Sequence, residues 1–434
     1  MLLSELFTKT SKAPVSDADS INADLLVRAG FVSKTMAGVY SFLPLGLKVI
    51  RKIENIVREE MDAIGGQEVM MSALAPREYW EKTGRWDNTV FESLFHVPAA
   101  GEKEYALNPT HEEVVVPLVK NFVRSYKDLP FACYQIQTKF RNEPRAKSGI
   151  LRGREFLMKD LYSFHASAED LDEYYAKVQD AYLKIMERLG LKDITYLTYA
   201  TGGSFSKYSH EYQVLLPQGE DTIYISEEAE KNGKKVAVNA EIYKEGETDC
   251  PETGGKAFRK ARASEAANIF KLGTKFSEPF DLNYTDEKGE RHLVVMGCYG
   301  IGISRLMGII AEAFADDKGL AWPSSVAPAQ AHIIPMAKTE KEESFKKALK
   351  LYEDLLKKGI ECIFDDRLDL SAGSRLADSD LIGVPKRIVI SPKSIDGGGA
   401  EIKDRLGKGM RVVGFGEIGK LIIPACRQAG KIEN

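Results

Sequence analysis

Cysteine is scarce in this chain, and its spacing is unlike that of a disulfide framework. The 434 residues include five cysteines, an odd number, at positions 133, 250, 298, 362 and 426. No CxxC pair occurs and the six histidines are widely spaced, which argues against a structural zinc site. Cys298, His111 and a carboxylate could still meet in space. We therefore expect free thiols in a reducing compartment.

Long apolar runs are missing as well. Pro44, Pro335 and Pro424 interrupt the most apolar stretches well before the ~20 residues that a bilayer-spanning helix needs. The first residues, MLLSELFTKTSK, lack the cationic start and apolar core of a secretory signal. The composition, 44% apolar and 29% charged, is ordinary for a chain of two or three globular domains. We expect a cytoplasmic enzyme without a membrane segment.

The chain also lacks the positive excess of a protein that coats nucleic acid, because its net charge is −4. Residues 331–434 differ from the rest, with 19 Lys and Arg against 16 Asp and Glu, a balance of +3. A mildly basic C-terminal module on an acidic body suits local contact with a polyanion.

What the sequence does contain, over residues 134–162, is a pair of segments in which polar and apolar residues alternate. A basic loop joins the two segments. In the first segment polar and apolar residues alternate up to Arg141, so that Arg141 and Glu143 point the same way. In the second segment the period of two aligns five residues on one face. They are Arg154, Phe156, Met158, Asp160 and Tyr162.

This face has two interpretations. An amphipathic hairpin often simply presents a solvated surface. Here, however, an arginine can fork onto a phosphate, a carboxylate can accept from an exocyclic amine, and a ring can stack on a base. The loop adds Arg145, Lys147 and Arg152, which could close over a polyphosphate. We therefore predict a nucleotide site.

Three segments resemble the motifs of class II aminoacyl-tRNA synthetases, and they occur in the right order. FRNE, the basic loop and GREF, residues 140–156, resemble motif 2; GCYGIGISRLMG, residues 297–308, resembles motif 3; residues 46–76 resemble motif 1. AGVYSFLPLG (37–46), NPTHEE (108–113) and MGCYGIG (296–302) are similar to prolyl-tRNA synthetases in particular.

The resemblance implies a multidomain α/β and α+β fold. Its parts would be a class II antiparallel sheet flanked by helices and a C-terminal α/β anticodon-binding domain with a mixed sheet. The expected boundaries are 1–222 for the first part of the catalytic domain, 223–262 for a short polar insertion, 263–330 for the second catalytic part and 331–434 for the anticodon-binding domain.

The resemblance also assigns residues to ATP. Arg141 would contact the α-phosphate, Arg152 and Arg305 the outer phosphates, Glu143 the adenine amine and Phe156 the adenine face. Arg305 is notable on its own, because an arginine in the first turn of an otherwise apolar helix is costly to bury without an anion. Arg141 and Arg305 are the expected catalytic residues, with Mg²⁺ assisting and no protein ligand for a metal assigned.

For the amino acid, the resemblance points to the loop at 108–113. Thr110 and Glu113 have the spacing of a capping box, which alone would mean only a helix start and would leave Glu112 free. A secondary ammonium in a closed pocket needs a carboxylate. We expect proline to be bound by five residues. They are Thr110, Glu112, Met158, Asp160 and Cys298, although Cys298 fits equally well as a small buried apolar residue.

Residues 45–64 have helical apolar spacing, and residues 67–74, closed by Pro76, predict a strand. The pattern alone fits a core helix, whereas the resemblance assigns these elements to a homodimer interface. A further helix is expected at 168–189 and a further strand at 209–216. Ser206 and Lys207 depart from the family pattern before His210, whose role the sequence leaves open.

The stretch from 222 to 263 is polar and rich in Lys, Glu and Gly. Bacterial prolyl-tRNA synthetases usually carry an editing domain here that removes mischarged alanine. About 40 residues are too few for a domain with its own core, so we expect no editing in cis.

In the C-terminal part, polar residues are expected to face the anticodon of tRNA(Pro), since unstacked bases are recognised by their edges. They are Asp366, Arg367, Arg375, Asp378 and Lys386. A catalytically silent paralogue would have lost some of Arg141, Glu143, Phe156 and Arg305, and all four are present. A threonyl pocket needs zinc ligands and a histidyl pocket a different specificity loop, so we predict a proline–tRNA ligase that uses ATP.

Overall fold

The computed structural model describes residues 1–202, 208–407 and 409–422. The positions Ser206, Lys207 and Cys426, which the sequence brought into question, lie outside the described residues. The chain divides into two compact units: residues 36–39 with 54–309, and residues 1–35 and 40–53 with the chain from Ile310 onward. No described helix is both long enough and apolar enough to span a bilayer.

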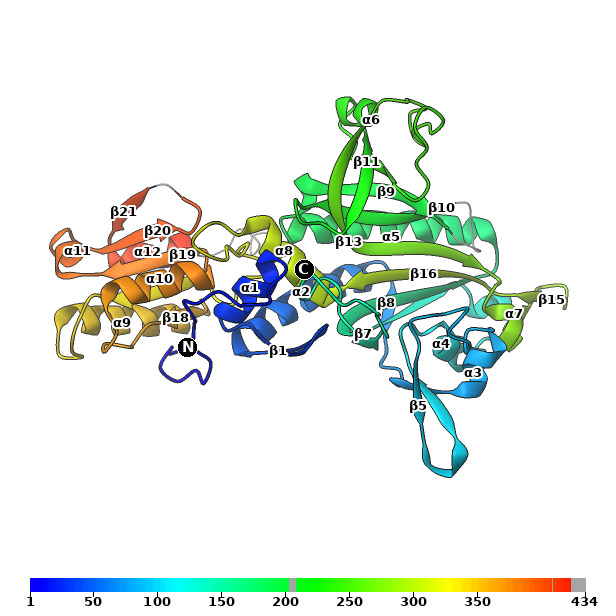
Figure 1. Cartoon of the computed structure of the whole chain (residues 1–434), viewed down its shortest axis with the longest axis horizontal. Helices are drawn as coiled ribbons and strands as arrows, with labels where there is room; N and C mark the ends of the chain where they lie inside the picture. The colour runs from blue at the N-terminus through cyan, green and yellow to red at the C-terminus, as the bar shows by residue number, and fades with distance from the viewer. Residues whose placement is uncertain (203–207, 408, 423–434) are drawn as a thin grey trace. The chain divides into compact units, whose positions relative to one another are not determined.

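A nine-stranded sheet forms the centre of the larger unit (Figure 1). Its order is β10 (Tyr208–Leu215), β9 (Thr195–Thr201), β12 (Val236–Asn239), β11 (Asp221–Ser226), β13 (Phe258–Gly273), β16 (Val295–Gly302), β8 (Glu155–His165), β7 (Phe131–Phe140) and β3 (Gly66–Glu68). Most neighbours are antiparallel; β3 with β7 and β12 with β9 are parallel. Strand β10 also pairs with β13, so that β9 to β13 close into a ring.

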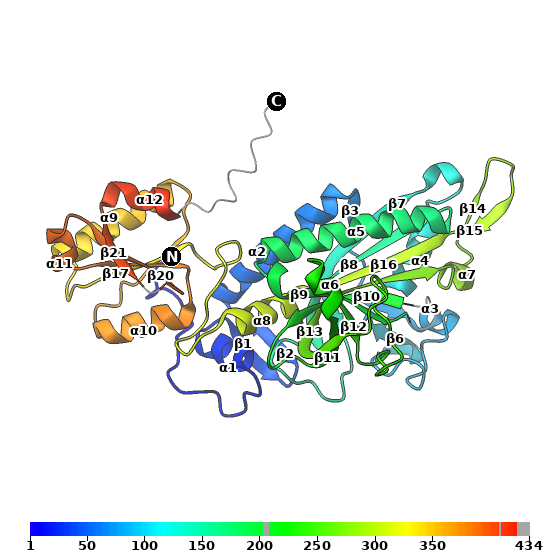
Figure 2. The ribbon, with the colours of Figure 1, turned by 90° about the horizontal axis from the view of Figure 1, so that it is seen from above.

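The predicted hairpin is confirmed as β7 and β8, which pair antiparallel over ten residue pairs. Helix α5 (Ala168–Arg188) packs along β8 and β16 and buries Leu171, Tyr182 and Ile185 (Figure 2). The predicted helix at 168–189 and strand at 209–216 thus occur as α5 and β10.

The polar stretch at 223–262 contains regular structure that its composition did not indicate. Strands β11 and β12 and the short helix α6 (Glu227–Lys231) lie in it, together with the start of β13. Ile223, Ile225 and Ala237 from this stretch are fully buried and form a small core with Tyr196. This part of the chain therefore completes the ring of strands.

The single strand predicted at 67–74 is wrong in detail. It is split between β3 in the main sheet and β4 (Leu74–Pro76), which pairs with β6 (Glu104–Leu107) and β5 (Phe95–Pro98) in a separate sheet. Between them the backbone of Met71 bonds to the side chains of Gln135 and Gln137 rather than to a neighbouring strand. Helix α2 (Pro44–Ala63) matches the predicted helix at 45–64.

Shorter elements complete the larger unit. They are α3 (Arg77–Lys82), η1 (Ala100–Glu102), α4 (Glu112–Lys120), η2 (Tyr126–Asp128), η3 (Lys192–Ile194), α7 (Ser277–Phe280), β14 (Asn283–Thr285) and β15 (Arg291–Leu293). The glycines of the GCYGIG segment lie inside β16, between β8 and β13. At Gly297 an added Cβ would lie 2.3 Å from the Tyr299 hydroxyl, so a larger residue does not fit.

The smaller unit contains the predicted mixed sheet, which has the order β18 (Cys362–Phe364), β17 (Ala331–Pro335), β19 (Lys386–Ile390), β20 (Ala400–Asp404) and β21 (Met410–Val413). The first three strands are parallel, and β20 and β21 are antiparallel to their neighbours. Its helices include α9 (Glu343–Lys357), α10 (Ala372–Ile382), α11 (Pro392–Asp396) and α12 (Phe415–Ile422). The remaining elements are α1 (Ile21–Arg28) and a hairpin of β1 (Val32–Met36) and β2 (Val39–Phe42). Helix α8 (Ile303–Phe314) begins in the larger unit and ends in the smaller one.

Candidate active site

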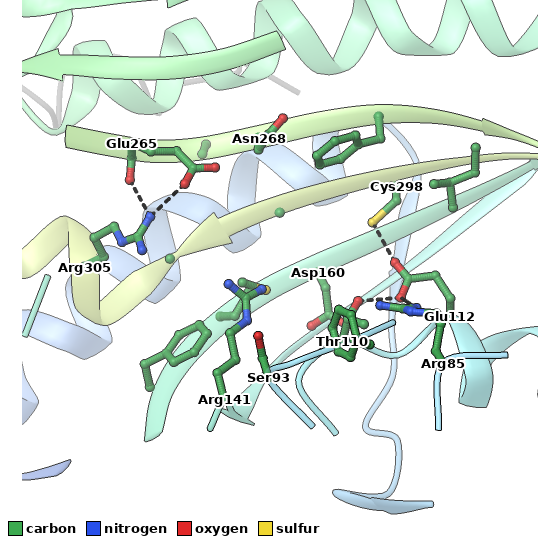
Figure 3. Close-up of a pocket in the computed structure, with 18 of the residues that line it drawn as sticks. Arg85, Ser93, Thr110, Glu112, Arg141, Asp160, Glu265, Asn268, Cys298 and Arg305 are labelled. Carbon is green, nitrogen blue, oxygen red and sulfur yellow. Dashed lines mark hydrogen bonds and ion pairs between the residues drawn. The ribbon is translucent and has the colours of Figure 1, made fainter. Parts of the chain in front are cut away.

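A cavity of about 670 Å³ opens on one face of the nine-stranded sheet. It is lined by residues from β8, β13, β16, the start of α8 and the loops before α4 and after β7 (Figure 3). Most of the residues predicted from sequence meet here. They are Thr110, Glu112, Arg141, Glu143, Phe156, Met158, Asp160, Cys298 and Arg305.

The register of the hairpin explains why these side chains share one face. Gln135 lies opposite Asp160, Gln137 opposite Met158 and Lys139 opposite Phe156. Cross-strand partners point to the same side of a sheet. The alternation seen in the sequence therefore becomes the floor of a cavity.

Two guanidinium groups from distant segments line one end of the cavity. Arg141 lies over the ring of Phe156, with its Cζ 5.1 Å from the ring centroid. Burial and the neighbouring Arg305 lower the pKa of Arg141. Among the described residues Arg141 makes no side-chain hydrogen bond or ion pair, so its donors are directed into the cavity. An anion would satisfy them.

Arg305 is held by β13. Its Nη1 donates to the backbone oxygen of Glu265 at 2.9 Å and lies 3.0 Å from the carboxylate, while its Nε donates to Leu151 at 2.7 Å. The anion that the sequence required for Arg305 is therefore Glu265 in this structure.

Arg152 does not line this cavity. Its Nε donates to the carboxylate of Glu143 at 3.0 Å, and both residues border an adjacent cavity of about 500 Å³ with Arg145 and Lys147. Glu143 lines both cavities, so the basic loop adjoins the Arg141 end of the site.

At the other end of the cavity, the side chains of Thr110 and Cys298 both form hydrogen bonds with Glu112. The Thr110 hydroxyl donates to Oε2 of Glu112 at 2.5 Å, and the Cys298 thiol donates to Oε1 at 3.3 Å. Burial raises the pKa of Cys298, with a further contribution from Glu112, so the thiol keeps its proton. The cavity thus presents a nearly buried carboxylate to a ligand.

The predicted capping box is wrong. Helix α4 begins at Glu112 and its N-cap is His111, whose side chain makes no capping bond. Glu113 is instead buried, where it accepts from Thr83 at 2.8 Å and from Arg85 at 2.9 Å. Glu112 is not free either, because Arg85 lies 3.6 Å from its Oε2.

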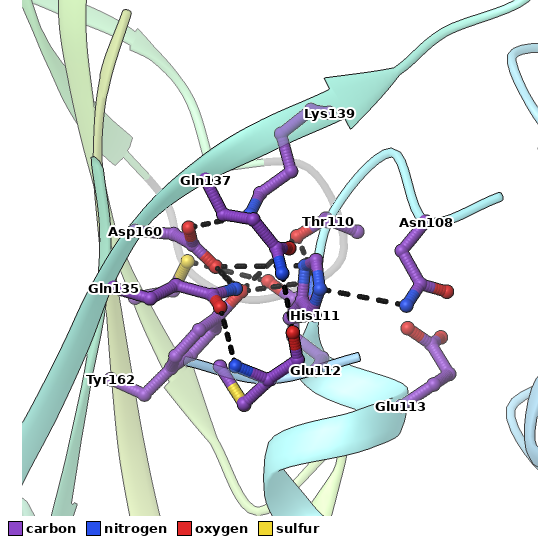
Figure 4. A network of polar contacts seen from close by, with 12 residues as sticks. Asn108, Thr110, His111, Glu112, Glu113, Gln135, Gln137, Lys139, Asp160 and Tyr162 are labelled. Carbon is purple, nitrogen blue, oxygen red and sulfur yellow. Dashed lines mark hydrogen bonds and ion pairs between the residues drawn. The ribbon is translucent and has the colours of Figure 1, made fainter. Parts of the chain in front are cut away.

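A buried polar network fixes this loop to the sheet (Figure 4). Lys139 and Asp160, both buried, pair at 2.7 Å, and Tyr162 donates to Asp160 at 3.2 Å. The same hydroxyl accepts from the backbone of His111 at 2.9 Å. Burial and the charge of Lys139 lower the pKa of His111 to about 4, so its ring is neutral at pH 7.

The possible metal site of Cys298 and His111 does not form. His111 Nε2 bonds to the backbone oxygen of Ser72, and among the described residues neither Cys298 nor His111 belongs to a cluster of potential ligands. Within the described ranges the one such cluster is Asp286, Glu290 and His292, at the β14–β15 hairpin.

The polar residues predicted to face tRNA lie in the smaller unit, and most of them form ion pairs or hydrogen bonds there. Arg367 pairs with Asp365 and Asp378, Lys386 with Asp404, and Asp366 accepts from Ser4. Arg375 is 2% exposed and donates to the backbone oxygen of Pro335. The expectation that its side chain faces outward is therefore wrong, because it packs under the end of β17.

Sequence reasoning missed several residues of the cavity. Arg85 and Phe276 border the Glu112 end, and Glu265 and Asn268 come from β13. None lies in a motif with recognisable spacing: Arg85 and Phe276 come from loops beside α3 and α7, and Glu265 and Asn268 reach the cavity through the pairing of β13. His210, which the sequence left open, bonds to the Tyr175 hydroxyl, and burial lowers its pKa to about 4.

The chain resembles known proteins over nearly its whole length. Residues 95–314 match the tRNA synthetase class II core domain (G, H, P, S and T), and residues 330–422 match an anticodon binding domain. Similar proteins include the proline–tRNA ligases of Caldicellulosiruptor saccharolyticus, at 35% identity over 92% of this chain and 94% of the relative, and of Dehalococcoides mccartyi strain 195, at 31% over 98% of each.

A similar fold occurs in prolyl-tRNA synthetase from Cryptosporidium parvum. Its complex with halofuginone and AMPPNP has a TM-score of 0.76 at 19% identity, over 92% of this chain and 75% of that one. Its complex with L-proline and AMP has a TM-score of 0.73 at the same identity.

The sheet, its cavity and the two domain matches define a class II aminoacyl-tRNA synthetase core joined to an anticodon-binding domain. Within that class, the identity to curated relatives over almost the full length of both chains identifies the family. The chain belongs to the prolyl-tRNA synthetases.

Proposed function

We propose that the cavity joins proline to ATP as prolyl-adenylate, and that the prolyl group is then transferred to the 3′ end of tRNA(Pro). One observation carries this proposal: Arg141 and Arg305 line one end of the cavity and Glu112 the other. In an aminoacyl-adenylate the anionic phosphate joins adenosine to the amino acid, whose ammonium lies beyond it, and this order of charges matches the polarity of the cavity.

The first step needs electrostatic help rather than a base. The carboxylate of proline is already ionised when it attacks the α-phosphorus, and the bond to diphosphate breaks. Negative charge builds on the phosphoryl oxygens, and fixed positive groups in a water-poor site stabilise it. We assign the contact with the α-phosphate to Arg141, which has no hydrogen-bond or ion-pair partner among the described residues. Holding the two anions together could contribute on the order of 7–11 kcal/mol.

Residues near Arg141 suit the rest of the nucleotide. Phe156 offers a face for adenine and Glu143 an acceptor for its amine. Arg305 would leave Glu265 for the outer phosphates, and Arg152 would reach them from the adjacent cavity. ATP therefore replaces protein carboxylates as the partner of these arginines.

Mg²⁺ fits the same end of the cavity, because hard cations prefer carboxylate and phosphate oxygens. Glu265 is a carboxylate in this cavity that Arg305 would release. When bound, the ion would neutralise charge on the outer phosphates. Glu265 would hold it together with the substrate.

At the other end, Oε1 of Glu112 has only a thiol donor among the described residues, so it can accept from the ammonium of proline. Thr110 orients the carboxylate, and Met158 and Cys298 line the space for the ring. Asp160 lines the floor with its charge balanced by Lys139. In the second step a terminal ribose hydroxyl of tRNA attacks the prolyl carbonyl carbon, the bond to the phosphate of AMP breaks, and we assign the proton of the hydroxyl to the phosphate of the departing AMP.

A pyrophosphate-exchange assay with a panel of amino acids tests this function. Exchange should require ATP and be fastest with proline. Exchange that is faster with threonine or histidine, or absent with every amino acid, would contradict it.

We also propose that the chain does not edit mischarged tRNA in cis. Its alignments with the Caldicellulosiruptor and Dehalococcoides relatives run over 540 and 566 positions, more than its own 434 residues, so the relatives carry inserted residues. Residues 223–262 meanwhile complete the ring of strands. Alanyl-tRNA(Pro) should therefore persist with enzyme present. Rapid enzyme-dependent deacylation would reject the proposal.

A homodimer through the motif 1 helix and strand is a further proposal. Met70, two residues beyond β3, is 83% exposed, and Leu74, the first residue of β4, is 47% exposed. A second copy would cover them. Light scattering should give twice the chain mass, and replacing Met70 with lysine should lower it; a monomeric wild type would contradict the assignment.

For the anticodon, Lys386 is a better probe than the buried Arg375. We propose that Lys386, with Asp366 and Arg367, contacts tRNA. Lys386→Ala should raise the KM for tRNA about two- to tenfold, as expected for one exposed charged contact of about 1 kcal/mol. Pyrophosphate exchange should not change; equal loss in both assays would rule out the role.

A further inference from the structure

Arg85 is shared between two adjacent carboxylates at the amino-acid end of the cavity. Its Nη1 lies 2.9 Å and 3.2 Å from the two oxygens of Glu113, and 3.6 Å from Oε2 of Glu112. Glu113 is fully buried and does not line the cavity, whereas Glu112 does. One cation therefore serves a carboxylate that faces the ligand and one that does not.

Aromatic rings hold Arg85 in this position. Its Cζ lies 4.2 Å from the ring centroid of Phe91 and 5.3 Å from that of Trp80. Trp80 and Phe91 are themselves stacked. Because the guanidinium is held between rings, its charge cannot swing away when the charge of a neighbour changes.

The charge that Glu112 offers to a ligand depends on Glu113. When Glu113 is ionised, it neutralises the charge of Arg85, so the negative charge of Glu112 can attract an ammonium. When Glu113 is neutral, the positive charge of Arg85 offsets the negative charge of Glu112 instead, and Arg85 repels a cationic ligand. The sum of the three groups is then −1 in the first state and zero in the second.

We propose that Glu113, acting through Arg85, is a positioning residue that sets the affinity of the pocket for the ammonium of proline. The inference rests on the function proposed above, in which Glu112 binds that ammonium. It predicts that binding of the amino acid favours the ionised form of Glu113. Proline binding should then release a proton in the pH range where Glu113 titrates.

That range is close to neutrality. Burial raises the pKa of Glu113 to about 7, against the opposing effect of Arg85 and with a further contribution from Glu112. Below pH 7 the carboxyl is protonated and the pocket is weaker; above pH 7 it is ionised and the pocket is stronger. The KM for proline should fall as the pH rises from 6 to 8.

Other groups near Arg85 and Glu113 are Thr83, which donates to Glu113, the phenol of Tyr162, and Lys275, whose pKa is lowered by burial and by the charge of Arg85. The pKa of Tyr162 is raised well above its usual value, so it stays neutral in this range. Burial raises the pKa of Glu211 to about 8, so this group titrates in nearly the same pH range as Glu113, and it accepts a hydrogen bond from the cavity residue Asn268. A pH profile alone would therefore be ambiguous, and variants of Glu113 are required.

The test is the KM for proline in pyrophosphate exchange from pH 6 to pH 8.5, at saturating ATP. In Glu113→Gln the carboxyl can no longer ionise, so KM should be about tenfold above wild type at pH 8 and should lose its step near pH 7. The KM for ATP should not change. Arg77→Met is the control, because Arg77 is an exposed arginine on α3 that packs over Trp86 and does not line the cavity.

A double variant separates charge from structure. Arg85→Met with Glu113→Gln removes the whole buried pair, which is tolerated better than removal of one partner. The double variant should bind proline more tightly than Glu113→Gln does. Its KM for proline should show no step near pH 7. A double variant that binds proline more weakly than Glu113→Gln, or a Glu113→Gln enzyme with wild-type KM and pH profile, would overturn the inference. If Glu113→Gln does not fold, a step near pH 7 that persists in the double variant overturns it equally.

The proposed function would fail differently. If Glu112→Gln leaves the KM for proline unchanged, the amino-acid site itself is misassigned. If that variant raises KM and the Glu113 variant does not, only the inference about Glu113 is wrong.

Discussion

Arg141→Ala should abolish pyrophosphate exchange with proline and leave the chain folded. The guanidinium lies over Phe156 and, within the described parts of the chain, has no protein anion to neutralise it, so removing it breaks no ion pair. Loss of a single donor to developing negative charge costs about 10²- to 10³-fold in kcat. The loss should appear in kcat at saturating ATP and proline, with a thermal transition close to that of wild type.

Arg124→Ala is a matched control for that experiment. Arg124 is an exposed arginine between α4 and η2 that borders neither the main cavity nor the adjacent one. It should keep most of the exchange activity. Near-normal exchange in Arg141→Ala would show that the phosphate is bound elsewhere.

Glu112→Gln should weaken proline binding and spare ATP. The substitution keeps the shape of the side chain and its bond with Thr110, but removes the charge that the ammonium requires. A hydrogen bond to a charged group contributes about 1.5–3 kcal/mol, so the KM for proline should rise roughly 10- to 150-fold.

The KM for ATP measured on the same enzyme is the internal control, because Glu112 lies at the far end of the cavity from Arg305 (Figure 3). Equal increases in both KM values would indicate a general disturbance of the sheet. An unchanged KM for proline would remove Glu112 from the amino-acid site.

Local patterns were sufficient for the floor of the site. Alternation over residues 134–162 predicted a hairpin, and the antiparallel register of β7 and β8 confirms it. The position of Arg305 in an apolar helix correctly indicated an anionic partner. Both predictions depend on neighbours in sequence, which is where periodicity is informative.

Other parts depend on contacts that no local pattern encodes. Thr110 and Glu113 have the spacing of a capping box, but a partly buried arginine 28 residues away binds Glu113 instead. Glu265 reaches Arg305 only because β13 pairs with β16. The burial of Arg375 follows from α10 packing against β17, which composition does not reveal.

The most direct test is a crystal structure of the enzyme with proline and a non-hydrolysable ATP analogue. The account predicts the α-phosphate within hydrogen-bond distance of Arg141, the outer phosphates on Arg305 in place of Glu265, and the ring ammonium on Oε1 of Glu112. A triphosphate bound away from Arg141 and Arg305, or proline bound away from Glu112, would contradict it.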